Sequence, residues 1–194
     1  MNRELIITMN YEGLMTELKQ ACRERNACKE GYEQLLRSKT VPEILRTVKD
    51  NWTDVWESKY ADIVERELPR WFAGQEEDFH KAGVYVNEPS KRGLCMVSQA
   101  EEVLEFGGNA RVYVFGKARV IARDNVELHC RCAEAEIELR DHAWGKVKAG
   151  RVVARDFTTV QSWQEVECHD AAHVTVWGGK VTDCGHRVLK IENS

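Results

Sequence analysis

Apolar and polar side chains alternate along the second half of the chain, from about residue 107 to the C-terminus. The alternation comes in units of about eight residues, of which the clearest are Gly108-Asn-Ala-Arg-Val-Tyr-Val-Phe, Gly116-Lys-Ala-Arg-Val-Ile-Ala-Arg and Asp124-Asn-Val-Glu-Leu-His-Cys-Arg. A period of two is typical of a strand that buries one face. Each unit therefore predicts one short strand.

A Gly or Asp followed by a polar residue opens each unit, and both residue types reach left-handed backbone angles at low cost. The units therefore predict sharp turns, and two architectures fit. One is a parallel β-solenoid with two or three strands per coil, and the other is an antiparallel β-meander with hairpin turns at Gly108-Asn109 and Asp124-Asn125. Small residues at the first inward position suit the narrow interior of a solenoid and favour it; they are Ala110, Ala118, Ala143 and Ala172.

The later units are less regular. The segment Glu134-Ala-Glu-Ile-Glu-Leu-Arg needs a one-residue insertion to stay in phase, and residues 157–164 fit the pattern poorly. Alternation returns in Ala172-His-Val-Thr-Val-Trp and again in Arg187-Val-Leu-Lys-Ile. We therefore expect a bulge or a short loop to interrupt the stack at residues 157–164.

The first 82 residues show helical spacing instead. Apolar residues from Leu14 to Cys22 recur on one face after a capping Asn10, which predicts a helix that continues to about Leu36. The sequence Thr40-Val-Pro-Glu43 has the form of a capping box and predicts a second helix from Val41. A further short helix is expected at Leu68-Pro-Arg-Trp71-Phe72.

An apolar stripe lies between these helices; its members are Trp52, Val55, Trp56, Tyr60, Ile63 and Val64. We expect it to pack against neighbouring helices and the open end of the solenoid, because an unpaired terminal coil exposes backbone groups. The alternative is a groove for a partner. The sequence thus predicts an α+β fold, with a helical N-terminal cap over residues 1–82, a junction over 83–106 that forms a hairpin or a first coil, and a parallel β-solenoid over 107–194.

The repeats of this second half, about 90 residues, resemble those of the octapeptide-repeat β-solenoid proteins of bacteria and their phages. Those repeats read Gly/Asp-Asn-Ala-x-Val-x-Ala, which the units beginning at Gly108, Gly116 and Asp124 match. The leader around Asn26-Ala-Cys-Lys-Glu-Gly and the segment Val84-Tyr-Val-Asn-Glu-Pro also look like what precedes such repeats. The resemblance implies a solenoid fold and a microbial origin, and it transfers no active site.

Composition limits the ligands and the cellular location that we expect. The formal net charge is -4 and neither half of the chain is basic, which argues against a nucleic-acid surface. The N-terminus lacks the features of a signal peptide, and no apolar run approaches the length of a membrane span. Seven scattered cysteines, an odd number, suit a reducing cytoplasm in which thiols serve as small apolar fillers.

Histidine and cysteine cluster in His129-Cys130-Arg-Cys132, Cys168-His169-Asp170 with His173, and Cys184-Gly-His186. Their spacings match no established zinc site, so we expect neither a metal nor a cofactor. The chain has no nucleotide-binding glycine motif and no nucleophile motif. Carboxylate pairs such as Glu136/Glu138 and Glu165/Glu167 resemble glycosidase acids, but alternating charge on an outward strand face is a commoner cause, and we expect no catalysis.

These observations favour a non-catalytic binding or scaffold protein that presents a rigid wall to a protein partner. Candidate contacts on the wall are Arg119, Arg123, Glu127 and Arg131. Trp163 and Trp177 are further candidates if they point outward, but for these two and Trp144 we favour inward or corner positions, where they only fill space. The last coil, near Val188 to Ile191, could pair with a second copy. The alternatives are an inhibitor of one host protein encoded by a mobile element, and a carbohydrate-binding or carbohydrate-active solenoid.

Overall fold

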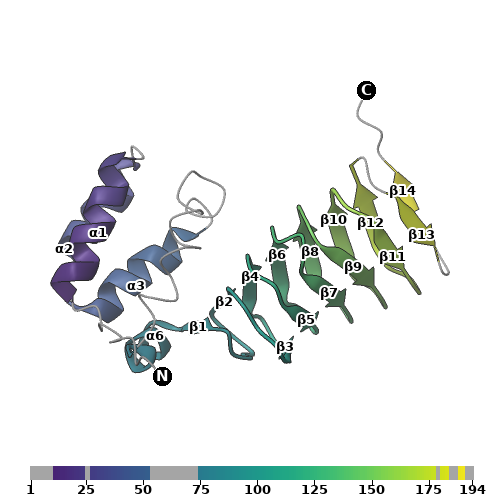
Figure 1. The fold of residues 1–194 in the computed structure, drawn as a ribbon, viewed down its shortest axis with the longest axis horizontal. Coiled ribbons are helices and arrows are strands. Elements are labelled where there is room, and N and C mark those ends of the chain that lie inside the picture. Colours follow the sequence, from purple (N-terminus) through teal and green to yellow (C-terminus); the bar gives the residue numbers. More distant parts are fainter. Residues whose placement is uncertain (1–10, 25–26, 53–73, 178–179, 184–187, 191–194) are drawn as a thin grey trace, which may run out of the picture. The chain divides into compact units, whose positions relative to one another are not determined.

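The computed structural model describes residues 11–24, 27–52, 74–177, 180–183 and 188–190 (Figure 1). The chain divides into two compact units, residues 1–84 and residues 85–194. In the described residues the first unit contains helices and the second contains parallel strands stacked as a solenoid. The α+β fold with N-terminal helices followed by a parallel β-solenoid is therefore confirmed.

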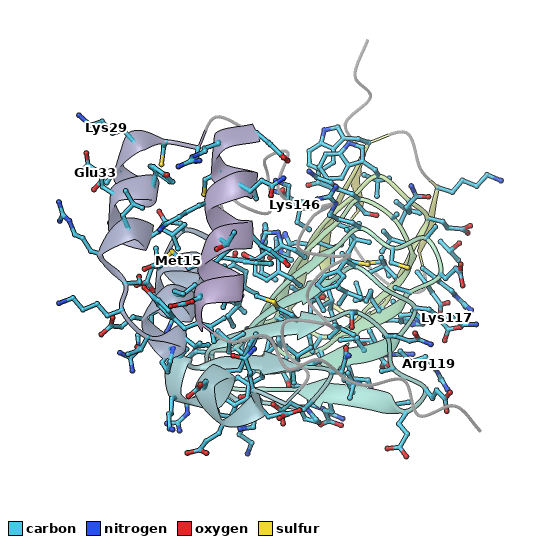
Figure 2. The ribbon with its side chains drawn as sticks, turned by 60° about the vertical axis from the view of Figure 1, so that its left-hand side comes forward. Met15, Lys29, Glu33, Lys117, Arg119 and Lys146 are labelled. Atoms are coloured by element: carbon cyan, nitrogen blue, oxygen red, sulfur yellow. The ribbon has the colours of Figure 1, made fainter. Side chains whose placement is uncertain are left out.

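The helical unit is organised around α3. Its described helices are α1 (Tyr11–Glu24), α2 (Lys29–Arg37), α3 (Val41–Asp50) and α6 (Glu76–Ala82). Helix α3 contacts the other three, and Ile44 and Phe79 are fully buried between them. The Lys49 ammonium donates a hydrogen bond to the Ala82 carbonyl at 2.7 Å, which satisfies one of the free carbonyls at the end of α6. The outer side of α2 is polar, with Lys29 paired to Glu33 (Figure 2).

The helix boundaries correct one expectation and confirm another. The helix expected to reach Leu36 ends at Glu24, and α2 starts separately after Cys28, whose extended backbone breaks the helical path. The predicted start at Val41 is confirmed, because the Thr40 hydroxyl accepts a hydrogen bond from the Glu43 amide at 3.4 Å. Of the apolar stripe only Trp52 is described, and it is buried. The rest of the stripe and the helix expected at residues 68–72 lie outside the described residues.

The solenoid has two sheets. Sheet A has the order β1 (Val84–Val86), β2 (Leu94–Val97), β4 (Arg111–Val114), β6 (Glu127–Cys130), β8 (Trp144–Val147), β10 (Thr159–Ser162), β12 (His173–Val176) and β14 (Val188–Lys190). Sheet B has the order β3 (Val103–Phe106), β5 (Arg119–Ala122), β7 (Glu136–Leu139), β9 (Arg151–Ala154), β11 (Val166–Cys168) and β13 (Val181–Asp183). From β2 onward the chain passes from one sheet to the other with each strand (Figure 1), so one coil is two strands and two units of the repeat.

Strand pairing is parallel for every pair from β2 to β14. The antiparallel meander is therefore wrong. The segment 83–106, for which a hairpin and a first coil were both open, contains β2 and β3, which pair in parallel with β4 and β5.

The coils shorten toward the C-terminus without a break in the stack. In sheet A the partner of Glu127 is Trp144, the partner of Trp144 is Thr159, and the partner of Thr159 is His173. These steps are 17, 15 and 14 residues, from the differences in residue number. The bulge expected at residues 157–164 is wrong, since β10 pairs along its full length with both β8 and β12. The shorter coils have shorter turns. Because turn residues lie outside the strand ladders, the shortening removes no ladder hydrogen bond.

The interior is filled mainly by apolar side chains from both sheets. The four alanines expected inside are Ala110, Ala118, Ala143 and Ala172, each at most 3% exposed. They lie at the corners, where the chain enters a strand, while Val, Leu and Ile fill the space between the sheets. Small corner residues let consecutive coils bend tightly and still close the core.

A ladder of aspartates forms the corner between sheet B and sheet A. Asp124, Asp141, Asp156 and Asp170 all have left-handed φ angles of 55° to 57°. In each coil a carboxylate oxygen accepts a hydrogen bond from the corner amide of the coil before it, at 2.6 Å (Gly108 to Asp124), 3.2 Å (Asp124 to Asp141), 2.9 Å (Asp141 to Asp156) and 3.3 Å (Asp156 to Asp170). The corner amides, which lie outside the strand ladders, thus gain partners through side chains.

We predict that Asp156→Ala destabilises the solenoid by about 1–3 kcal/mol, because the Asp141 amide loses its acceptor and alanine must adopt a left-handed angle. Asp156→Asn keeps an acceptor oxygen and tolerates this angle, so its stability should stay near that of the wild type. Urea unfolding followed by circular dichroism measures both. Equal stability of the two variants would show that the ladder contributes nothing.

Candidate functional site

The outward side chains of sheet B form the most regular charged surface in the described part of the chain, and we call it the sheet B wall. Because strand partners are in register, these side chains form rows along the stack. The first row runs through Val103, Arg119, Glu136 and Arg151. The middle row is Glu105, Ile121, Glu138, Val153, Glu167 and Thr182. The third row follows the strand ends and is Arg123, Arg140, Arg155 and His169.

Ion pairs tie the three rows together. Arg119 Nε lies 3.1 Å from Glu136 Oε2 within the first row, and Arg123 Nε lies 2.6 Å from a Glu105 oxygen. Farther along the stack, Arg151 and His169 both contact Glu167, at 3.3 Å and 2.7 Å. Neighbouring coils thus cross-link one another through their outward side chains, which fixes the positions of long charged groups that would otherwise be free to rotate.

Glu138 is the centre of this network. Its Oε1 accepts hydrogen bonds from Arg140 at 2.7 Å and from Arg155 at 2.9 Å. Partial burial by itself would raise the pKa of Glu138, but these two hydrogen bonds and the charges of the arginines outweigh it and hold the pKa below its ordinary value. A glycosidase acid needs a raised pKa, so the environment of Glu138 is the opposite of what the Glu136/Glu138 pair would need for that role.

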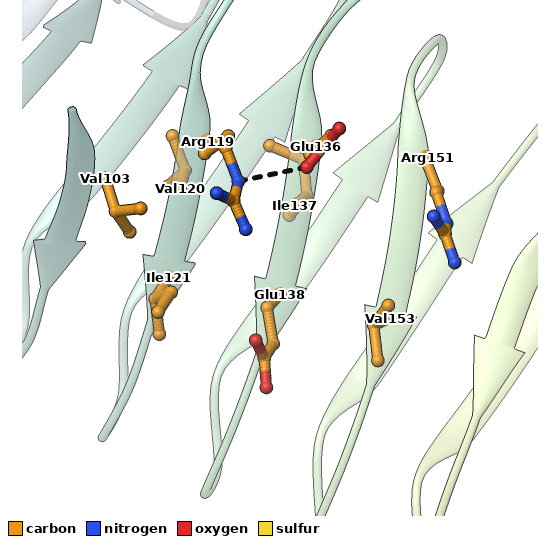
Figure 3. Close-up of a pocket in the computed structure, with 9 residues that line it drawn as sticks. All are labelled: Val103, Arg119, Val120, Ile121, Glu136, Ile137, Glu138, Arg151 and Val153. Carbon is orange, nitrogen blue, oxygen red and sulfur yellow. Dashed lines mark ion pairs between the residues drawn. The ribbon is translucent and has the colours of Figure 1, made fainter. Parts of the chain in front are cut away.

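A hollow of about 230 Å³ opens on the sheet B wall (Figure 3). The side chains of Val103, Ile121 and Val153 give it an apolar lining, and Arg119, Glu136, Glu138 and Arg151 stand around them. Val103 is 45% exposed, which is high for an apolar side chain. A second hollow lies beside it, between Arg151, Glu165 and Thr182. The wall therefore combines exposed apolar side chains with charged side chains between and around them.

The four charged candidates from the sequence lie on two walls. Arg119 and Arg123 belong to the sheet B wall, and Arg119 points away from the solenoid (Figure 2). Glu127 lies in β6 and Arg131 follows it, both on sheet A. Residues one repeat unit apart fall on opposite sheets because a coil contains two units. Glu127 accepts a hydrogen bond from the ring of His129 at 2.8 Å.

Trp163 and Trp177 do not fill the interior. Each follows a strand of sheet A at the same corner of successive coils, and their rings stack with centroids 4.5 Å apart. Trp163 is 38% exposed, so the pair forms an aromatic edge on the surface. The two residues thus lie at a corner, one of the two places favoured for them, but there they stack on the surface and do not pack in the interior. Trp144 lies apart from them, at the start of β8 and edge-on to His129.

The histidine and cysteine candidates are not brought together. In the described residues no group of three or more His, Cys, Asp or Glu side chains could hold a metal ion. His129 and His169 contact Glu127 and Glu167 of their own strands. Cys168 is buried in the core. Cys184 and His186 lie outside the described residues.

Sequence reasoning named Glu138 and Glu167 only as possible glycosidase acids, and it missed Ile121, Val153 and two of the arginines beside them. The signal was present, because three strands of sheet B end in the same way: Val-Ile-Ala-Arg123, Ile-Glu-Leu-Arg140 and Val-Val-Ala-Arg155. To recognise this shared ending in the sequence, a reader must compare every second unit, and the number of residues between those units differs from coil to coil. Only the register of the strands shows that these arginines form one row.

No protein-family model matches the sequence, and comparisons with characterised proteins and with solved structures give no match either. A separate observation concerns membranes: within the described ranges, no helix has both the length and the apolar character needed to cross a bilayer.

We predict that Glu138→Gln lowers stability at pH 7 by about 1 kcal/mol, because the two arginines lose a charged partner. The pKa of Glu138 is depressed in the folded state, so its contribution is complete above the unfolded value and disappears as the pH falls through the folded value. Urea midpoints at pH 7, 5, 4 and 3 should therefore converge for wild type and variant in acid. Glu165→Gln, on the same wall, is the matched control, and a constant difference at every pH would refute the assignment.

We predict that the thiols divide into two classes. Burial raises the pKa of Cys95 and of Cys130 to about 12, so neither forms the reactive thiolate near neutral pH. Iodoacetamide at pH 8 should label exposed Cys28 in the native protein and label Cys95, Cys130 and Cys168 only after unfolding. Mass spectrometry of the peptides measures this, and native labelling of Cys130 would contradict its placement inside the coil.

Proposed function

We propose that the protein is a non-catalytic binding protein of bacterial or phage origin, which presents the sheet B wall to a protein partner. The observation that carries this proposal is the arrangement of the wall. Ile121 and Val153 lie in its middle row on either side of Glu138, and ion-paired arginines and glutamates border them on both sides. Exposed apolar side chains set among arginine-rich polar groups are typical of protein interfaces.

The rigidity of the wall supports the same function. Its strands are hydrogen-bonded to neighbours along the stack, and the charged side chains of the first and third rows are already in ion pairs. A partner that docks on such a surface immobilises few additional groups, so less of the contact energy is lost as entropy. The alternation of Arg119, Glu136 and Arg151 also favours a partner with the complementary order of charges.

We propose that the protein works in the cytoplasm. We also propose that it belongs to the octapeptide-repeat β-solenoid proteins. The described cysteines are all free thiols, as a reducing compartment would leave them. Strand β14, at the end of sheet A, pairs with β12 in the described residues, and a second copy that extends this edge would give a dimer.

The test uses affinity capture with the full chain, followed by measurement of the captured protein in purified form. We predict that Arg119→Glu and Ile121→Ser each weaken binding of a genuine partner at least about tenfold, because one reverses a border charge and the other removes apolar contact at the centre. Lys117→Glu is the matched control, since it makes the same charge change on an exposed lysine outside the wall.

The outcomes separate the alternatives. Self-association or several partners would indicate a scaffold, whereas one partner held at equal stoichiometry would indicate an inhibitor of a single host protein. If every captured protein binds both wall variants as tightly as the wild type, or if none is captured, the sheet B wall is not a protein-binding surface.

A further inference from the structure

A second surface with a different chemistry lies on the C-terminal part of sheet A. The outward side chains of β10 and β12 are Thr159, Gln161, His173 and Thr175, and we call them the threonine face. Thr159 is in register with His173, and Gln161 with Thr175, so the four form a flat array with neighbouring strands about 4.8 Å apart. Thr159 and His173 are exposed, and the other two are partly exposed.

The polar groups of the threonine face are turned to solvent. In the part of the chain that the structure describes, no hydrogen bond or ion pair engages these four side chains. The sheet B wall is the reverse, because its arginines and glutamates neutralise one another. The threonine face thus retains its full capacity to form hydrogen bonds.

Aromatic side chains border the threonine face at both ends of β10. Phe157, two residues before the strand, is 65% exposed and stacks on His142 of the preceding coil at 5.6 Å. Trp163, directly after the strand, stacks on Trp177. Six residue steps separate Phe157 from Trp163, a span of at most roughly 20 Å. The face is therefore a polar strip closed at each end by an exposed ring.

This arrangement does not suit an anion or a protein. None of the four side chains carries a carboxylate, an ammonium or a guanidinium, and although Lys146 of β8 is in register with Gln161, one neighbouring cation is not the cluster of Lys and Arg that an anionic polymer requires. Protein interfaces place their aromatic anchors at the centre and their polar groups at the rim. Here the polar groups occupy the centre and the rings lie at the margins.

A neutral carbohydrate fits both features. Threonine hydroxyls, the glutamine amide and a neutral imidazole can each donate and accept a hydrogen bond, as sugar hydroxyls do. Aromatic rings offer apolar surface for the C–H faces of sugar rings. We propose that the threonine face, bordered by Phe157 and the Trp163–Trp177 pair, binds a neutral glycan chain that lies across β10 and β12. This site is separate from the sheet B wall, so it stands whether or not that wall binds a protein.

The test is a glycan array followed by calorimetry with purified full-length protein. The probes are hexasaccharides of β-1,4-glucose, β-1,4-N-acetylglucosamine and α-mannose, with hexagalacturonate as the charged comparison. We expect binding of at least one neutral probe, with tryptophan fluorescence changed on binding, and no binding of the charged probe. Trp163→Ala should lower the affinity at least about tenfold, and Gln161→Ala about threefold or more.

Controls distinguish loss of the site from loss of the fold. Gln161→Ala changes one outward polar side chain and leaves the core untouched, so it serves if Trp163→Ala folds poorly. Arg119→Glu, on the other wall, should bind the neutral probe as the wild type does. The proposal is overturned if no neutral probe binds with a dissociation constant below about 1 mM, if both face variants bind unchanged, or if they abolish binding of a captured protein instead.

Discussion

Hydrogen bonding between successive coils is the constraint on which the solenoid depends. Each strand from β4 to β12 pairs in parallel with the equivalent strand of the coils on both sides, so no coil satisfies its own backbone groups. The aspartate ladder extends this principle to the corner, where side-chain oxygens serve as acceptors for amides between strands. Coil length can therefore vary from 17 to 14 residues while the ladders stay continuous, because the difference is confined to the turns.

The inward side chains and the backbone hold the stack together, so the outward side chains determine the chemistry of each surface. This chemistry differs between the two sheets. Sheet B presents Ile121 and Val153 between rows of paired charges, whereas the C-terminal strands of sheet A present uncharged polar groups between exposed rings. The same scaffold thus carries two surfaces whose chemistries suit different classes of ligand, and neither contains a described cluster of residues that could hold a metal ion.

Much of the fold could be read from the chain because the signals are local. Alternation with a period of two identifies the strands, small residues such as Ala110 and Ala143 mark the tight corners, and Thr40 with Glu43 marks the start of a helix. The failures were also local. Helical spacing continues past Glu24 although the backbone at Cys28 is extended, and residues 157–164 lose the repeat phase although β10 pairs in full register. In both cases backbone pairing or backbone angle overrode the side-chain pattern.

The amino-acid sequence by itself determined that the second half forms short strands around a narrow apolar interior, since side-chain period and corner size are set residue by residue. The tertiary structure alone decided which strands are neighbours. Arg155 reaches Glu138 of the preceding coil, and Trp163 meets Trp177, only because coils of unequal length stack in register. Those contacts depend on pairing between distant segments, which no local pattern specifies.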